Sequence, residues 1–161
     1  MVIVLMGVAG SGKTTVGRQL AADLGWSFAD ADGFHPPANV AKMSAGQPLD
    51  DTDRAPWLAA IRDYITARQA RSESAVITCS ALKERYRQAI VTDPAQVKLV
   101  HLHGSRALLW ERISSRQNHF MKPAMLDSQL AALEPPAGAL TVDIGPPPAQ
   151  IAATIRRALF L

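Results

Sequence analysis

The octapeptide GVAGSGKT occupies residues 7–14 and directly follows a short apolar run, Val2 to Met6. It matches the GxxxxGK[ST] pattern of a phosphate-binding loop. Glycines at positions 7, 10 and 12 allow successive backbone N–H groups to converge on an anion. The residues after the loop have a helical pattern, and a helix N-terminus favours bound negative charge. The stretch therefore predicts strand, phosphate loop and helix, and with them a nucleotide-binding protein.

The loop residues have different expected roles. We expect Lys13 to reach the β- and γ-phosphates of ATP as a catalytic group. The hydroxyl of Thr14 is expected to ligate the Mg²⁺ ion that bridges those phosphates. The residues predicted to bind the nucleotide are Gly7, Val8, Ala9, Gly10, Ser11, Gly12, Lys13 and Thr14.

Apolar runs alternate with helical patterns along the rest of the chain. The runs that favour strands are residues 26–29, 75–79, 97–102 and 140–144. Helices are predicted over residues 38–45, from an N-cap at Asp53 through Ile65, and over residues 82–91, 107–115, 126–133 and 151–159. This alternation is typical of an α/β fold with a parallel sheet and right-handed crossovers. We expect one domain, residues 1–161, with a five-stranded sheet between two layers of helices.

Composition narrows the class of protein. The chain has 161 residues, 48% of them hydrophobic, and a single cysteine, so it is expected to be globular without an internal disulfide. Its first apolar run is too short for a signal peptide or a membrane span, which predicts a cytoplasmic protein without a membrane partner. The net charge is +3, but the basic residues form no run, so no nucleic-acid partner is expected.

Two aspartates follow the second predicted strand. Asp30 and Asp32 are two residues apart at a strand end, where both carboxylates can face a nucleotide crevice. In phosphoryl transfer one carboxylate can hold Mg²⁺ through water while another accepts the proton of the attacking hydroxyl. We assign the metal role to Asp30 and the base role to Asp32.

The phosphate loop alone does not separate a kinase from a GTPase switch or a mechanical ATPase. Asp30 to Gly33 matches the Asp-x-x-Gly of GTPases, but the guanine-reading Asn-Lys-x-Asp is missing. The predicted class is an ATP-dependent kinase of a small anionic metabolite. Basic residues that could bind such an acceptor are Lys42, Arg54, Lys83 and Arg87, and Arg112 and Arg116 could neutralise charge in the transition state from a lid.

Three longer blocks resemble the bacterial gluconate kinases. They are ADADGFHPPANVAKMSAGQPLDDTDRAPWL at residues 29–58, CSALKERYR at 79–87 and RISSRQNHFMKPAMLDSQLAALEPP at 112–136. The resemblance implies a fold like that of nucleoside monophosphate kinases and shikimate kinase. It also implies transfer of the ATP γ-phosphate to the 6-hydroxyl of D-gluconate, with Mg-ATP as cosubstrate, and commonly a homodimer. One departure is Asp50, where relatives often have asparagine.

The resemblance also carries site residues onto this sequence. It implies an acceptor-binding excursion at about residues 32–58 and a lid at about 112–125, where Arg112 and Arg116 lie. The acceptor residues that it implies are Asp32, His35, Lys42, Arg54, Lys83 and Arg87. Two alternatives stay open: a kinase of another acceptor, such as shikimate or a nucleoside monophosphate, and a nucleotide-dependent switch or nucleic-acid-binding protein.

Overall fold

Strand β1 (Val2–Met6) is apolar on both faces and lies at the centre of the protein. In the computed structural model, which describes residues 1–115 and 123–161, all five residues of this strand are fully buried. Ile3 and Leu5 pack into the core on one face of the sheet, and Val2, Val4 and Met6 pack into the core on the other. A strand covered on both sides is what a parallel sheet between helices requires.

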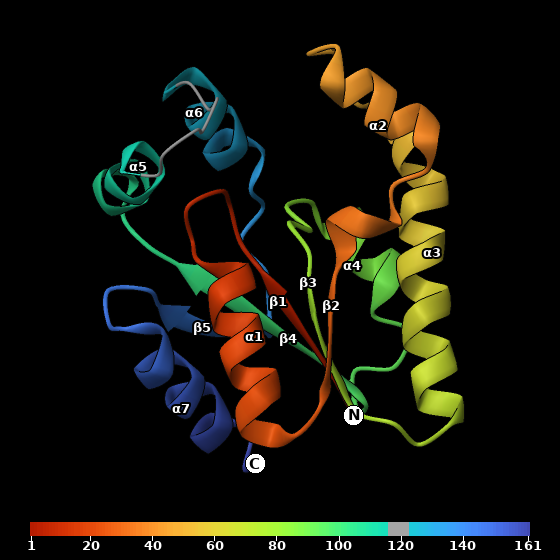
Figure 1. Cartoon of the computed structure of the whole chain (residues 1–161), viewed down its shortest axis with the longest axis vertical. Coiled ribbons are helices and arrows are strands. Elements are labelled where there is room, and N and C mark those ends of the chain that lie inside the picture. Colours follow the sequence, from red (N-terminus) through yellow and green to blue (C-terminus); the bar gives the residue numbers. More distant parts are fainter. Residues whose placement is uncertain (116–122) are drawn as a thin grey trace.

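The sheet is entirely parallel, as predicted. Its strands are β1, β2 (Ser27–Asp30), β3 (Ala75–Thr78), β4 (Val97–His103) and β5 (Leu140–Asp143), in the order β2-β3-β1-β4-β5. Because β1 pairs with both β3 and β4, the phosphate loop that follows it leaves the middle of the sheet (Figure 1). The first and second crossovers place their helices on opposite faces.

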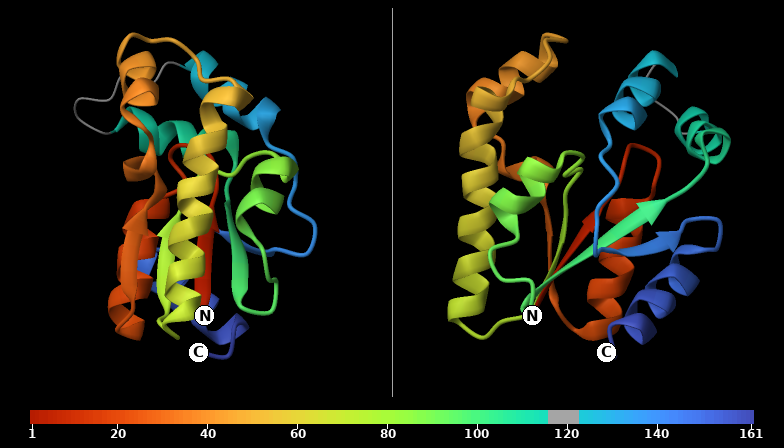
Figure 2. Two further views of the ribbon diagram at one scale, coloured as in Figure 1. Left: turned by 90° about the vertical axis from the view of Figure 1, so that its right-hand side faces the viewer. Right: turned by 180° about the vertical axis from the view of Figure 1, so that it is seen from behind.

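Helices cover both faces and complete the three layers (Figures 1 and 2). Helices α1 (Lys13–Leu24) and α7 (Pro148–Ala158) cover one face, and α3 (Asp51–Ala70) and α4 (Glu84–Ile90) cover the other. Beyond the carboxyl ends of the strands lie α5 (Arg106–Ser114) and α6 (Pro123–Ala132) on one side, and α2 (Pro37–Ser44) on the other. No helix within residues 1–115 and 123–161 is both long and apolar enough to cross a lipid bilayer.

The segment between β2 and α3 leaves the sheet and is held against α3. It begins with a 3₁₀ turn, η1 (Ala31–Phe34), which was not predicted and which the Asp30 carboxylate caps by accepting the N–H of Asp32 at 3.2 Å. The indole N–H of Trp57 in α3 donates to the carbonyl oxygen of Ala31 at 2.7 Å, and both residues are buried. This bond fixes the start of the excursion relative to the long helix.

The prediction that Asp53 is the N-cap of α3 is wrong. Asp50 is the N-cap: its carboxylate accepts the N–H of Asp53 at 2.8 Å, and the Asp53 carboxylate accepts the N–H of Asp50 at 3.0 Å. This reciprocal pair is a capping box with aspartate in the third position. Pro56 also lies inside the helix, and because proline has no N–H, the carbonyl of Thr52 lacks its usual intrahelical donor. Elsewhere the predicted elements exist and their ends shift by one to three residues, with β2 extending to Asp30.

The capping box makes Asp50 the residue on which the start of α3 depends. Replacing Asp50 with alanine removes a cap and is expected to cost about 1 kcal/mol, whereas Asp50→Asn keeps a side-chain acceptor and is expected to cost much less. Thermal unfolding of the two variants measures the difference, which corresponds to roughly 2–4 °C in Tm for a chain of this size. Equal Tm values for the two variants would mean that the cap does not stabilise the helix.

Candidate active site

The phosphate loop packs closely against β4 and α5. Gly10 has φ 80° and Gly12 has φ 83°, both in the left-handed region that glycine tolerates. A Cβ atom at Gly10 would lie 2.8 Å from the carbonyl oxygen of Leu109 and 2.9 Å from the side chain of Ile113. The loop therefore needs glycine at this position for space as well as for conformation. Within the loop, the Lys13 ammonium donates to the carbonyl of Val8 at 3.1 Å.

Thr14 and Asp30 lie together at the start of α1 and the end of β2. The Thr14 hydroxyl donates to Asp30 Oδ2 at 3.0 Å. Both groups are hard oxygen ligands, which Mg²⁺ prefers, and the ion commonly keeps several waters while one or two protein oxygens hold it. The predicted pair thus fits a magnesium ion held by Thr14 directly and by Asp30 through water.

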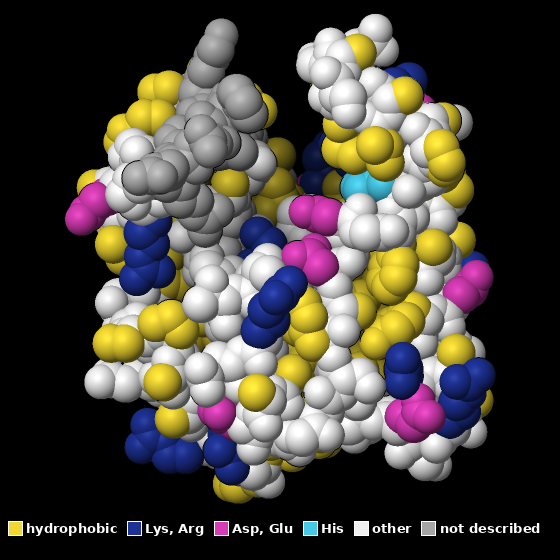
Figure 3. All heavy atoms as spheres, viewed as in Figure 1, with side chains coloured by type: hydrophobic (Ala, Val, Ile, Leu, Met, Phe, Trp, Pro, Cys, Tyr) yellow, Lys and Arg dark blue, Asp and Glu magenta, His cyan; other side chains and the backbone are white. Residues whose placement is uncertain are grey.

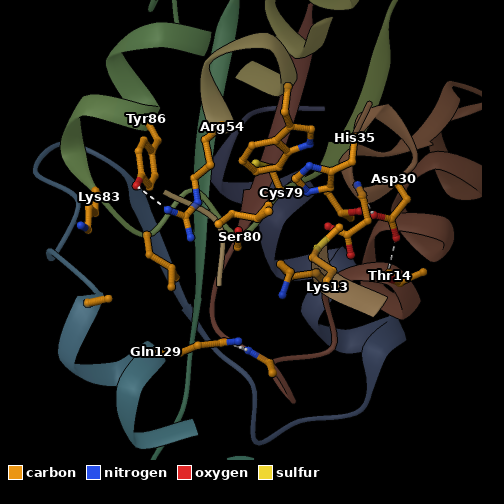
Figure 4. Close-up of a pocket in the computed structure, with 18 of the residues that line it drawn as sticks. Lys13, Thr14, Asp30, His35, Arg54, Cys79, Ser80, Lys83, Tyr86 and Gln129 are labelled. Carbon is orange, nitrogen blue, oxygen red and sulfur yellow. Dashed lines mark hydrogen bonds between the residues drawn. The ribbon is translucent and has the colours of Figure 1, made fainter. Parts of the chain in front are cut away.

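One cavity of about 860 Å³ joins the loop to the acceptor excursion. It opens between α2 and the α5–α6 side of the molecule, and Figure 3 shows acidic and histidine side chains on its wall. The structure brings ten of the predicted residues to this cavity: Ala9, Gly10, Gly12, Lys13, Thr14, Asp30, Asp32, His35, Arg54 and Lys83. Figure 4 shows that the loop and the acidic residues face the basic side chains across it.

His35 is held in a fixed orientation on the acceptor side. Its ring stacks on Trp57 with the centroids 4.5 Å apart and an angle of 10° between the planes, and its Nδ1 lies 3.2 Å from the side-chain amide nitrogen of Asn39. Burial lowers the pKa of His35, the negative charge of Asp32 acts in the opposite direction, and the Arg54 guanidinium lowers the pKa further. The neutral imidazole is therefore the favoured form near pH 7.

Three cations lie around the ring of Tyr86 on the opposite wall: Arg54 and Lys83 also line the cavity, whereas Arg85 does not and pairs with Asp51. The Arg54 guanidinium carbon lies 5.5 Å from the ring centroid and the Lys83 ammonium 6.0 Å from it. The Tyr86 hydroxyl donates to Asp51 at 2.6 Å and accepts a hydrogen bond from Arg54 at 3.3 Å. Tyr86 thus orients Arg54, and Arg54 and Lys83 together form a patch able to bind an anion.

Two predicted acceptor residues lie outside this cavity. The ammonium of Lys42 forms an ion pair with Asp53 at 2.8 Å, which joins α2 to α3. Arg87 is buried, and its guanidinium donates to the carbonyls of Ala81 and Leu82 at 3.0 Å each and to the Glu84 carboxylate. As the structure stands, these donors bind protein atoms and do not face the cavity.

Of the two arginines predicted in the lid, Arg112 lies within the described residues. Arg112 donates to the carbonyl of Ile144 at 2.6 Å, and its NH1 atom lies 4.0 Å from where a Cβ atom of Gly12 would be, so this side chain lies beside the phosphate loop. Arg116 falls outside the described residues.

Several residues at the cavity were not predicted as site residues. Trp57 and Tyr86 lie within residues 29–58 and 79–87, which resemble the gluconate kinases. Nothing local in the sequence shows that Trp57 stacks on a histidine or that cations lie around the ring of Tyr86. Gln129 and Ser80 also line the cavity. Cys79 lines it too, but burial raises the pKa of its thiol to about 12, so the group stays protonated and is a poor nucleophile.

Known proteins resemble this chain in sequence and in fold. A model of the AAA domain family matches residues 2–136, which places the chain in that domain family. A gluconokinase from Gluconobacter oxydans (strain 621H) is 50% identical over 134 residues, which are 83% of this chain and 75% of the relative. The chain belongs to the gluconokinase family. A crystal structure of the gluconokinase from Sinorhizobium meliloti 1021 superposes with a TM-score of 0.83 at 43% identity, covering 98% of this chain and 94% of that one.

The gluconokinase family also shares its fold with more distant kinases. A shikimate kinase from Aquifex aeolicus vf5 has a TM-score of 0.63 at 19% identity, covering 99% of this chain and 96% of that one. At that identity the likeness concerns the fold alone, and it confirms the predicted phosphate-loop kinase architecture.

The environment of His35 leads to a testable titration. Its pKa, measured by NMR of the imidazole protons, is expected below the ordinary value of about 6.5. Arg54→Met removes a nearby positive charge and should raise this pKa, whereas Asp32→Asn removes a nearby negative charge and should lower it further. A His35 pKa that stays unchanged in both variants, or that shifts equally in both, would show that these charges do not affect the imidazole.

Proposed function

We propose that the protein transfers the γ-phosphoryl group of ATP to the 6-hydroxyl of D-gluconate, giving 6-phosphogluconate and ADP. The observation that carries this proposal is that one cavity has the phosphate loop and Asp32 at one side and the Arg54–Lys83 patch at the other. D-gluconate has a carboxylate at one end of its chain and the 6-hydroxyl at the other. Its two ends match the two sides of the cavity, and relatives of 40–50% identity carry the name gluconokinase.

On the nucleotide side, the protein binds and neutralises the phosphates of ATP. Backbone N–H groups of the loop other than that of Ala9, together with the N-terminus of α1, surround the β-phosphate. Lys13 leaves its contact with Val8 to reach the γ-phosphate. Arg112, beside Gly12, adds positive charge near the transferred group. Thr14 would hold Mg²⁺ directly and Asp30 would hold it through water, and a bound ion would supply positive charge beside the phosphate oxygens.

On the acceptor side, Asp32 accepts the proton of the 6-hydroxyl while that oxygen attacks phosphorus. Arg54 and Lys83 bind the carboxylate, and a guanidinium oriented by Tyr86 can do so through two parallel hydrogen bonds. Neutral His35, fixed on Trp57, is placed to exchange hydrogen bonds with the hydroxyls between the two ends. Lys42 reaches the acceptor when its ion pair with Asp53 opens.

The larger organisation follows from the same proposal. Residues 1–161 act as one domain, with residues 32–58 binding the acceptor and a lid at about 112–125 closing over ATP with Arg112 and Arg116. The excess of basic residues between Gly104 and Lys122 supports the lid, because the sequence of this segment has four basic residues and one acidic residue, Glu111. We also propose a homodimer, as the resemblance to bacterial gluconate kinases implies, and a cytoplasmic location.

A panel of acceptors tests the reaction directly. Purified protein with Mg-ATP is expected to release ADP with D-gluconate and to leave shikimate and nucleoside monophosphates largely unphosphorylated, as measured by a coupled assay. Mass spectrometry should show one added phosphoryl group on gluconate, at the 6-hydroxyl by NMR. Efficient turnover of shikimate or a nucleoside monophosphate with gluconate inert would overturn the proposal and favour the alternative acceptor.

Two substitutions separate the two sides of the cavity. Asp32→Asn keeps the size of the side chain but removes the base, so kcat should fall by about 10²- to 10⁴-fold while the affinity for ATP is retained. Arg54→Met removes a charge-assisted contact worth roughly 1.5–3 kcal/mol, so the KM for gluconate should rise by about 10- to 100-fold with the KM for ATP unchanged. Steady-state kinetics in both substrates tests this, and a KM effect from Asp32→Asn with full kcat would contradict the base role.

A further inference from the structure

The segment from Gln129 to Glu134 contacts both loops of the active site. The side-chain oxygen of Gln129 in α6 accepts the backbone N–H of Ala9, in the phosphate loop, at 2.8 Å (Figure 4). Five residues later, the N–H of Glu134 donates to the carbonyl of Leu82 at 2.9 Å, and its carboxylate accepts the N–H of Glu84 at 2.6 Å. One short piece of chain is thus bonded to two segments that are far apart in sequence.

The second of these segments, residues 80–84, forms the acceptor wall of the cavity. Leu82 and Lys83 line the cavity. The preceding residue, Ala81, is buried with φ 43°, a left-handed conformation that disfavours a residue with a Cβ atom. Arg87 holds the carbonyls of Ala81 and Leu82 from the other side. The conformation of this segment therefore depends on contacts from outside it, and Glu134 supplies two of them.

We propose that Gln129 and Glu134 are positioning residues that fix the distance between the phosphate loop and the acceptor wall. The proposal rests on the phosphoryl transfer proposed above. Transfer requires the attacking oxygen about 3–3.5 Å from phosphorus, and a displacement of about 1 Å can cost on the order of 10²-fold in rate. Gln129 acts through the backbone of Ala9 and Glu134 through the backbone of Leu82 and Glu84, so neither has to touch the reacting atoms.

The amide of Gln129 suits its place beside the phosphates. Its oxygen accepts the N–H of Ala9 without bringing a negative charge into the cavity, which Gln129 also lines. A glutamate at this position could still accept that hydrogen bond, but its carboxylate would repel the phosphate oxygens of ATP. Glu134 is different, because its carboxylate lies at the start of α4, where negative charge is favoured by the helix dipole.

The test uses Gln129→Ala, Gln129→Glu and Glu134→Ala, with Ser128→Ala as control because Ser128 is the exposed neighbour of Gln129 on the same helix. Glu134→Ala removes the side-chain acceptor of the Glu84 N–H. With Mg-ATP and gluconate, Gln129→Ala and Glu134→Ala are expected to lower kcat by about 10- to 100-fold, with both KM values within about threefold of the wild type. Gln129→Glu should in addition raise the KM for ATP. Ser128→Ala should leave all three constants unchanged.

The double variant Gln129→Ala/Glu134→Ala gives a readout that a general loss of stability would not produce. If both residues fix one distance, the second substitution should lower kcat by less in the double variant than it does in the wild-type background. The first substitution has then already changed the distance between the phosphate loop and the acceptor wall. Tm values measured on the same samples check that the proteins are folded at the assay temperature.

Other results of these assays would contradict the positioning roles or the proposed function. Undiminished kcat in Gln129→Ala with a lower KM for ATP would mean that Gln129 competes with ATP for the N–H of Ala9, and undiminished kcat without that change would remove its role. Losses that multiply in the double variant, in step with falling Tm, would mean a merely structural contribution. A wild-type protein inactive on gluconate defeats the proposed function instead, and the same kcat ratios, measured with the acceptor that the panel identifies, still decide the positioning proposal.

Discussion

The site depends on the close approach of the phosphate-loop backbone to β4 and α5. Cβ atoms at Gly7 and Gly10 would lie 2.8 Å from the carbonyl oxygens of Leu102 and Leu109 respectively, so the loop is packed as tightly as a core element. N–H groups held by packing are already oriented when an anion arrives, and little has to reorganise for them to bind it. Since β1 lies between β3 and β4, the loop is also anchored at the centre of the sheet.

The acceptor excursion between β2 and α3 is built differently, because it rests on α3 and not on the sheet. The bond from Trp57 to the carbonyl of Ala31 holds the start of the excursion, and the stacking of His35 on the same indole holds the next turn. The pairing of Lys42 with Asp53 adds α2 to this arrangement. A change in these residues can alter the acceptor excursion while the packing of the phosphate loop stays intact. One fold can therefore serve kinases with different acceptors.

Local patterns in the sequence predicted most of the fold and about half of the site. The phosphate loop, the parallel sheet and the approach of Asp30 and Asp32 to the cavity depend on short motifs and on strand ends, which can be recognised without tertiary information. The N-cap at Asp50 was misplaced because Asp50 and Asp53 are both acceptable caps and only the backbone decides between them. Gln129 was missed because its partner, Ala9, is 120 residues away.

The basic residues show most clearly why residue type alone did not assign the site. Removing a guanidinium from water is costly unless protein acceptors replace its hydration, so the buried Arg87 must use its donors on carbonyls and on Glu84. Such an arginine cannot also bind a substrate anion without breaking those bonds. Arg54 and Lys83 are only half-buried and lie against the face of an aromatic ring, whose weak attraction leaves a cation able to bind an incoming carboxylate. What separates the cations proposed to bind the acceptor from the structural ones is the strength of the contacts that each already makes with the protein.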